Sequence, residues 1–487
     1  MTPRDALEHL WMLADCDPAA LDMLRIEGED PGLPSLFRVG TLAAATIGAA
    51  GLAAAQLHRM RSGEAQRVMI DVRRALAAFR SERYLSVEGG PPIELRHPVT
   101  GYFATRDGRW IQLHANFTHH LEGILRVLGC TGERETVAAA IRGWDGAELD
   151  SALAQAGLCA ALIRSPREWA ALEQAKAVAN LPLFEIERIG EAPREMPKVA
   201  RVPTAHRGRA DEALPVRPLE SVRVLDLTRI IAGPVAGRTL ASHGADVLLV
   251  NGAHLPNIGP LVIDNGRGKR SATLDLRERA GCETLRELVR DADVFLQSYR
   301  PGALAARGFG PEELARLRPG IVCVSVSAYG HQGPWRERRG FDSLVQSASG
   351  IVWAESVEAS RGSGVAPFET PRPLPCQALD HATGYLAAFG AMVALARRAT
   401  EGGSWHVRVS LAQTGRWLQT MGTVDGGQRV PDPHGEDVAD CLETMDSPFG
   451  RLRVAASAEQ LSLTPARFAR PPVPIGTDAP AWPSQSA

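Results

Sequence analysis

Hydrophobic and polar residues follow a regular strand and helix pattern over the second half of the chain. Short apolar runs such as VRVLDL (222–227) and ADVLLV (245–250) predict buried strands, and amphipathic segments between them predict helices. One such helix has Pro234 in its first turn and Gly244 past its end. We expect an α/β fold with a Rossmann-like, doubly wound, mainly parallel sheet in a large domain over 219–423. Ligands should bind beyond the carboxyl ends of its strands.

The rest of the chain divides by composition and periodicity into four further parts. TGYFATRDGRWIQLHA (100–115) predicts a hairpin turning at Asp107 and Gly108, and HHLEGILRVLGC and SPREWAALEQA predict amphipathic helices. The expected parts are a helical segment at 1–90, a small α+β domain at 91–190, a linker at 191–218 rich in Pro, Arg and acids, and an extended Pro-rich tail at 424–487.

Composition restricts the partners and the location. The formal net charge of −2 argues against a basic surface for nucleic acid, so small-molecule partners are expected. Seven cysteines without a Cys-x-x-Cys pair indicate a reducing compartment and no zinc site, and acids near the N-terminus argue against a signal peptide. The apolar run 39–57 predicts a buried helix rather than a membrane span. We therefore expect a cytoplasmic protein that binds no membrane.

A single acid, Asp380, precedes the very apolar segment 383–396. Asp is a preferred N-cap residue, so capping is one interpretation. The other is a nucleophile, because a helix start favours a carboxylate and a desolvated carboxylate can attack an electrophile. His381 receives a structural interpretation, since neighbours at a helix start point about 100° apart. His119 and His120 lack a second ligand pair at metal spacing, so no metal site is expected.

One internal repeat is visible. Residues 51–72 match residues 390–411 in register, and both segments predict an Ala-rich buried helix, a glycine turn and a strand. The position that corresponds to Asp380 is Thr41. Only the second copy therefore carries the acid.

Several segments resemble family III CoA-transferases, the CaiB/BaiF-like superfamily that includes formyl-CoA transferase and α-methylacyl-CoA racemase. They are VRVLDLTRIIAGPVAGRTLASHGADVLLV, GKRSATLDL, DVFLQSYRPGALAARGFG, SAYGHQGPWRERRGFDSLVQSASG and ALDHATG, in the family's order. Residues 97–114 resemble the hairpin of the family's small domain, which ordinarily follows these motifs. Here it precedes them, so the domain order looks rearranged.

The resemblance implies an acyl-CoA:carboxylate CoA-transferase in which Asp380 is the nucleophile. In the family this acid attacks the acyl-CoA thioester to give an acyl-aspartyl anhydride, and the CoA thiolate then returns to form an aspartyl-CoA thioester. The implied partners are an acyl-CoA and a carboxylic acid acceptor, without a metal or redox cofactor. The family also implies a homodimer of interlocked chains, with each site formed between the large domain of one subunit and the small domain of the other.

The resemblance further places coenzyme A against a set of residues in the large domain. Arg277 is the expected phosphate partner, because guanidinium groups suit phosphate. The expected CoA-binding residues are Ile230, Ile231, Leu274, Arg277, Ser298, Tyr299, Arg307 and Arg339.

The departures from the family pattern affect the substrate. Asn251 stands where the family usually has an acid, and Ile231 stands where formyl-CoA transferases have glutamine. Phe341 occupies the histidine position of the racemases, which makes an isomerase the weaker enzyme alternative. The turn TRIIAGPVAG lacks the G-x-G-x-x-G of dinucleotide dehydrogenases. A degenerate relative that binds CoA without turnover is the remaining alternative.

Overall fold

The structure, a computed structural model, describes residues 1–91, 93–196, 216–361 and 370–483. Most of the expected linker, at 197–215, lies outside the described residues. The strands expected in the large domain are present in one sheet of seven strands, in the order β10-β9-β8-β11-β12-β13-β7. All pair in parallel except β7, which runs antiparallel to β13. The strands are β7 Phe184–Gly190, β8 Arg223–Leu227, β9 Asp246–Asn251, β10 Lys269–Thr273, β11 Val294–Gln297, β12 Val322–Ser327 and β13 Ser404–Ser410.

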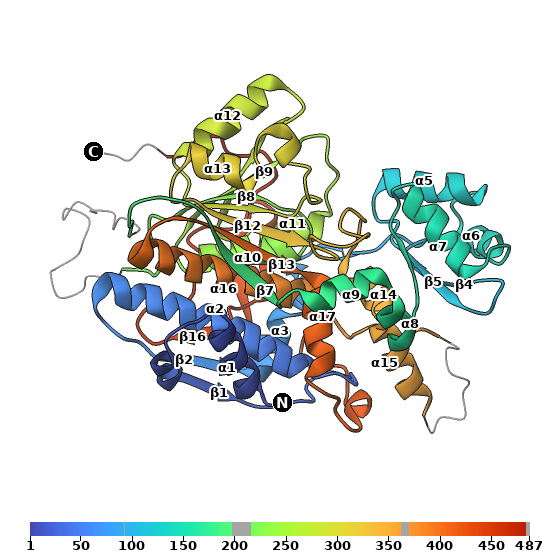
Figure 1. The fold of residues 1–487 in the computed structure, drawn as a ribbon. Coiled ribbons are helices and arrows are strands. Elements are labelled where there is room, and N and C mark those ends of the chain that lie inside the picture. Colours follow the sequence, from blue (N-terminus) through green and yellow to red (C-terminus); the bar gives the residue numbers. More distant parts are fainter. Residues whose placement is uncertain (92, 197–215, 362–369, 484–487) are drawn as a thin grey trace.

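Helices cover both faces of this sheet (Figure 1). Successive side chains of a strand point to opposite faces, so Val294 packs into one core and Phe295 into the other. The helices α10 (Ala232–Ser242) and α16 (Ala378–Glu401) lie on the first face, whereas α12 (Arg279–Arg290) and α13 (Pro311–Leu317) lie on the second. The chain is therefore a mixed α/β protein, as the pattern predicts.

The repeat seen in the sequence is a repeat in the structure. Helix α2 (Val39–Ser62) packs against α16, and both have 24 residues. Each leads into a strand and a further helix: β2 (Val68–Asp71) and α3 (Val72–Ala78) in the first copy, β13 and α17 (Leu411–Thr420) in the second. By length and composition α2 and α16 could each cross a membrane, but 94% and 100% of their apolar windows are buried inside the protein. Their apolar surfaces are thus used in packing, as expected for residues 39–57.

The small α+β domain contains the expected hairpin. Strands β4 (Gly101–Ala104) and β5 (Trp110–Leu113) pair antiparallel, and Gly108 in the turn has a φ of 73°. One prediction here is wrong in detail: the segment expected as a single helix at 165–175 is interrupted by Leu172, which is extended. The domain also contains β6 Ala160–Leu162, α5 Thr118–Leu128, α6 Arg134–Ile141 and α7 Gly146–Gln155, followed by α8 Pro166–Ala171 and α9 Glu173–Asn180. Strand β7 follows in sequence but belongs to the large sheet.

The C-terminal segment, residues 424–483, contains more regular structure than the extended tail that the sequence predicts. Strands β14 (Leu442–Ser447) and β15 (Gly450–Ala455) form a hairpin that pairs with β3 (Ser86–Val87), and β16 (Glu459–Leu461) pairs with β2. The following residues lie along the large domain, where the Trp482 indole N–H donates to the Leu288 carbonyl (2.9 Å). The remaining elements are α1 Pro3–Leu13, β1 Leu24–Glu27, α4 Ser81–Tyr84, α11 Gly259–Asn265, α14 Asp342–Ala348, α15 Ile351–Ser360 and the 3-10 turns at 18–23, 305–307, 427–429 and 439–441.

The closeness of α16 to α10 gives a stability prediction. A Cβ added at Gly384 would lie 2.5 Å from the Ala232 carbonyl oxygen and 2.7 Å from the Val235 Cβ. We expect Gly384→Ala to lower the free energy of unfolding by about 1–3 kcal/mol, because a packed interface must open to admit the methyl group. Denaturant unfolding measures this. Gly259→Ala, at a helical glycine with no atom within 4 Å, is the control; equal midpoints for the two variants would contradict the prediction.

Candidate active site

Asp380 is the third residue of α16 and is buried, with 7% of its surface exposed. The capping interpretation is wrong, because the N-cap residue is Gln377. Among the residues that the structure describes, no hydrogen bond to the Asp380 carboxyl group is found. The side chain is therefore available for chemistry.

A second acid, Asp342, holds the start of α16 from outside the helix. Its Oδ2 accepts the backbone N–H of Asp380 (2.8 Å). Its Oδ1 accepts the side-chain amides of Gln346 and of Gln377, the latter at 2.9 Å with the amide oriented so that its oxygen accepts from Arg96 Nη2 (3.0 Å). Asp342 thus satisfies N–H groups that the helix cannot, and it positions the backbone of Asp380.

A third acid completes a group of buried carboxyls. Glu82 lies in α4, and its Oε2 is 3.0 Å from His381 Nε2, with both side chains buried. Burial raises the pKa of Asp380 well above its ordinary value, and the charges of Asp342 and Glu82 raise it further. Burial also raises the pKa of Asp342 to about 6. The start of a helix lowers the pKa of a carboxyl group, but at Asp380 burial and like charges outweigh this effect.

Two cavities meet at Asp380. The first has a volume of about 400 Å³ and the second about 470 Å³, and their walls share Ile230, Ile231, Phe341 and Asp380. A third cavity of about 210 Å³ shares Tyr299 with the first. The nucleophile candidate therefore lies where a long ligand and a second reactant can meet.

The expected CoA-binding residues lie in the walls of these cavities. The first cavity is lined by Ile230, Ile231, Ser298, Tyr299 and Arg339. The third is lined by Leu274, Arg277, Tyr299 and Arg307. The structure thus brings all eight to connected walls at the carboxyl ends of the strands, and their contact with coenzyme A stays a prediction.

Three of these residues, all arginines, are engaged by neighbours. The Arg277 guanidinium donates to the Asp275 carboxylate (2.9 and 2.6 Å), and Arg307 Nη1 donates to the Leu276 carbonyl (2.5 Å). Arg339 Nη1 lies 2.9 Å from His120 Nε2. Burial lowers the pKa of His120 to about 3, so its neutral ring accepts this hydrogen bond.

Ile230 has a backbone conformation that a β-branched residue rarely adopts. Its φ is 77°, and its carbonyl accepts a hydrogen bond from Asn265 Nδ2 (3.0 Å). Such a conformation costs roughly 1–3 kcal/mol and is concentrated at functional sites. The hydrogen bond from Asn265 holds the loop between β8 and α10 in this conformation, and Ile230 and Ile231 of this loop line both cavities at Asp380.

Sequence reasoning missed the residues that the first half of the chain contributes. Glu82, Arg83 and Arg96 line the second cavity, together with His114 from the small domain. No local motif marks them. Asp342 had a signal, because it lies in the GFD segment where Phe341 was singled out.

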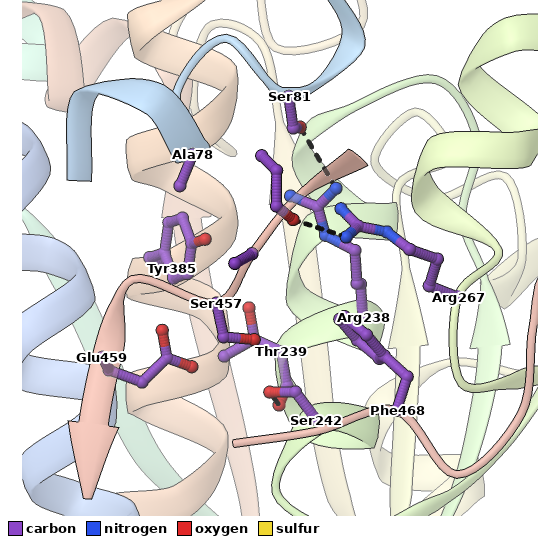
Figure 2. Close-up of a pocket in the computed structure, with 12 residues that line it drawn as sticks. Ala78, Ser81, Arg238, Thr239, Ser242, Arg267, Tyr385, Ser457, Glu459 and Phe468 are labelled. Carbon is purple, nitrogen blue, oxygen red and sulfur yellow. Dashed lines mark hydrogen bonds between the residues drawn. The ribbon is translucent and has the colours of Figure 1, made fainter. Parts of the chain in front are cut away.

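A smaller cavity of about 20 Å³ lies behind α4 and has room for water only (Figure 2). Arg238 and Arg267 both bind the Asp264 carboxylate (2.7 and 2.9 Å), and the Ser81 hydroxyl donates to it (2.6 Å). Arg267 also donates to the Ala455 carbonyl (2.6 Å). This network connects the large domain, α4 and the C-terminal segment. It holds Ser81 in place, which directly precedes Glu82.

Among the described residues, no group of three or more His, Cys, Asp and Glu side chains is arranged to hold a metal ion. The side chains available to an anionic cofactor or substrate are the arginines of the three cavities. The group at Asp380 can supply a carboxylate nucleophile.

Comparisons with known proteins agree with this chemistry. The family model described as CoA-transferase family III matches residues 21–211 and 219–443. The chain is 32% identical over 355 residues to an acyl-CoA transferase of Gibberella moniliformis, covering 69% of this chain and 58% of that protein. It is 34% identical over 203 residues to succinyl-CoA–D-citramalate CoA-transferase of Chloroflexus aurantiacus, covering 39% and 48%.

Among solved structures, the chain matches Rv3272 from Mycobacterium tuberculosis with 30% identity and a TM-score of 0.36, covering 42% of this chain and 58% of that one. The chain spans about half the length of the curated relatives it matches. Each segment matched by the family model contains one copy of the internal repeat.

The raised pKa of Asp380 predicts how activity should depend on pH. A carboxyl group can act as a nucleophile only in its carboxylate form, so with Asp380 as the predicted nucleophile kcat/KM should fall as the pH decreases through its raised pKa. Glu82→Gln removes a nearby negative charge but keeps an acceptor for His381, so it should lower the pKa of Asp380 and move the acid limb to lower pH. The measurement is kcat/KM against pH. Glu94→Gln, at an exposed acid of the same cavity, should leave the limb in place; an unmoved limb in Glu82→Gln would contradict the prediction.

Proposed function

Because the chain belongs to CoA-transferase family III, we propose that it transfers coenzyme A from an acyl-CoA thioester to a carboxylic acid, with Asp380 as the nucleophile. The observation that carries the proposal is the place of Asp380, a buried carboxyl group at the junction of two cavities. One cavity suits the CoA arm and the other suits the acyl group or the acceptor acid.

The proposed steps need no net proton transfer. The Asp380 carboxylate attacks the thioester carbonyl, the carbon–sulfur bond breaks, and CoA leaves as a thiolate, which gives a mixed anhydride. The thiolate then attacks the aspartyl carbonyl, which releases the donor acid and forms an aspartyl-CoA thioester. The acceptor carboxylate attacks this thioester, which breaks its carbon–sulfur bond, releases the CoA thiolate and forms a second mixed anhydride. The thiolate finally attacks the acceptor carbonyl, which gives the new acyl-CoA and restores the Asp380 carboxylate. An ionised nucleophile is sufficient, so the site needs no general base.

Coenzyme A is proposed to lie along the first and third cavities. The sheet order, in which β8 lies between β9 and β11, supports a Rossmann-like doubly wound fold, in which nucleotides bind beyond the carboxyl ends of the strands. Arg277 and Arg307 in the third cavity are suited to the phosphates. Arg229 and Arg339 line the first cavity together with Asp380, which supports a role for them in stabilising the thiolate that develops there.

The racemase alternative has less support. Phe341 offers no proton at the position where racemases have histidine, and its ring stacks on His114 with a centroid distance of 3.8 Å. The alternative of a degenerate relative without turnover fits the first copy of the repeat but not the second, since Thr41 stands in the first copy at the position of Asp380. The second copy keeps both the acid and the cavities.

One chain supplies both sides of the proposed site. Glu82, Arg96 and His114 come from the first segment matched by the family model, and Asp380 comes from the second. We therefore propose that a single chain forms a complete site without a residue from a partner. The homodimer and the cytoplasmic location expected from the sequence stay predictions.

The nucleophile is tested by substitution and by trapping. We expect Asp380→Ala to reduce transfer by about three orders of magnitude or more, as removal of a covalent nucleophile does. The protein incubated with an acyl-CoA and quenched should show an acyl or CoA adduct on the peptide that contains Asp380, by mass spectrometry. Thr41→Ala, at the matching position of α2, should keep the adduct and the rate. Full activity in Asp380→Ala would refute the assignment.

A further inference from the structure

The two copies of the internal repeat separate residues that the helix start needs from residues that the site needs. In both copies an acid from another segment accepts N–H groups at the start of the buried helix, Asp342 for α16 and Asp30 for α2. This acceptor is present with or without a nucleophile, since Thr41 stands in the first copy at the position of Asp380. A polar residue that is present only beside Asp380 is therefore a candidate for a role in the chemistry.

The register of the repeat continues beyond residue 72. Helices α3 and α17 start at matching positions. The segments that follow them contact the other copy in the same way. Arg80 Nη2 donates to the Pro375 carbonyl (2.8 Å), and the Val424 N–H donates to the carbonyl of Leu36, which matches Pro375 (2.8 Å). Each copy thus supplies a segment beside the start of the buried helix of the other copy.

The buried pair of Glu82 and His381 is present in one copy only. Glu82 lies in the segment after α3, and His381 follows Asp380 in α16. In the same register Met421 matches Glu82 and Leu42 matches His381, and both are buried in the apolar core. Apolar side chains therefore satisfy the packing at these positions. Burying a carboxylate and an imidazole costs desolvation free energy that apolar residues do not cost, so packing does not explain the polar pair.

His381 holds the Glu82 carboxylate by one hydrogen bond. Its Nε2 lies 3.0 Å from Glu82 Oε2, and a carboxylate only accepts, so Nε2 carries the proton. Its Nδ1 is buried without a hydrogen-bond partner, so a doubly protonated ring would bury a second N–H without an acceptor. The neutral ring avoids this cost. The pair therefore keeps the single negative charge of Glu82 in place.

This charge acts on the nucleophile candidate. Glu82 and Asp380 line the same cavity, and the charge of Glu82 raises the pKa of Asp380. Within the described residues, the ion-pair partner of Glu82 is His381, so no arginine neutralises this charge by direct contact.

Other titratable groups surround the pair from several elements. Arg238 of α10 and Arg267 are bound to Asp264 of α11. Burial raises the pKa of Cys376 and of Tyr385 to about 12, so both are neutral. The other titratable or charged groups that line the cavity are Arg83, Glu94, Arg96, His114 and Asp342.

We propose, on the basis of the proposed function, that Glu82 supplies a fixed negative charge beside the nucleophile and that His381 is a positioning residue that acts through Glu82. Repulsion from Glu82 destabilises the Asp380 carboxylate and makes it a stronger base, and therefore a stronger nucleophile towards the thioester. When the anhydride forms, Asp380 loses its charge and the repulsion is relieved. The first copy of the repeat thus serves the reaction of the second.

The test gives the second copy the residues of the first. The double variant Glu82→Met/His381→Leu removes both members, so neither is left buried without its partner. We expect it to fold and to move the acid limb of kcat/KM to lower pH by about one unit. The plateau above the limb should fall by about threefold or more, because a less basic carboxylate is a weaker nucleophile. The measurements are denaturant unfolding and kcat/KM against pH, with the acyl-CoA that forms the Asp380 adduct.

A second measurement needs no turnover. A water-soluble carbodiimide modifies carboxyl groups at a rate that falls as they ionise, and peptide mass spectrometry follows the label on Asp380. The pH at which labelling falls should decrease by the same amount in the double variant.

Single variants separate charge from packing. His381→Leu leaves Glu82 buried without a partner, which favours its neutral form, so the limb should move as in the double variant. His381→Gln can still donate to Glu82 and should keep the limb in place. Phe79→Leu is the packing control, because the Phe79 ring stacks on His381 and Leu418 stands at the matching position. It should also leave the limb in place.

The outcomes distinguish this proposal from the proposed function. An unchanged pH for labelling and for the acid limb in a folded double variant would overturn the role of the pair. Failure of the double variant to fold would also overturn it, since the pair would then be needed for packing. Absence of any Asp380 adduct in the unmodified protein would instead refute the proposed function, while the labelling would still test the pair.

Discussion

The hydrogen bond from the backbone N–H of Asp380 to the buried Asp342 carboxylate is the interaction on which the site depends. Helix α16 has no side-chain cap of its own, so a residue from α14 supplies the acceptor. This frees the Asp380 side chain from capping and holds it at the junction of the cavities. The same carboxylate adds a negative charge beside Asp380, so the group that positions the proposed nucleophile also raises its pKa. Position and reactivity are thus coupled through one residue.

In the first copy of the repeat, an acid also accepts the free N–H groups at the start of the buried helix, but Thr41 stands at the position of Asp380. Asp30 accepts the N–H groups of Gly40 (2.7 Å) and Thr41 (3.0 Å) at the start of α2, together with the Thr41 hydroxyl (2.6 Å). The buried helix still needs an acceptor for its free N–H groups, but the third residue is no longer an acid. We interpret α2 as the structural partner of α16, since the two pack together and bury each other's apolar surface. The first copy contributes to the site through the segments that follow it.

Local pattern predicted the elements well and the site in part. The strands of the large sheet, the hairpin turning at Gly108 and the buried helices follow from alternation, turn residues and length, which act over a few residues. The break at Leu172 and the pairing of β16 with β2 depend on tertiary contacts that local pattern does not encode. Asp380 was found because an acid in an apolar helix is unusual. Glu82 and Arg96 were not, because they reach the site from almost 300 residues away in the sequence.

The electrostatics of the carboxyl group favour acylation. A buried carboxylate beside Asp342 and Glu82 is destabilised by lost hydration and by like charges. In the proposed first step Asp380 attacks a thioester, its charge leaves this group of acids, and an equal negative charge develops on the CoA sulfur. The first cavity, which is proposed to hold that sulfur, is lined by Arg229, Arg338 and Arg339 and contains Asp380 as its acid. Negative charge therefore moves from a region rich in acids towards one rich in arginines, so the field of the protein assists the first step. The thiolate must then move back against this field to attack the aspartyl carbonyl, which breaks the anhydride and releases the donor acid, so this second step requires the thiolate to stay bound close to Asp380.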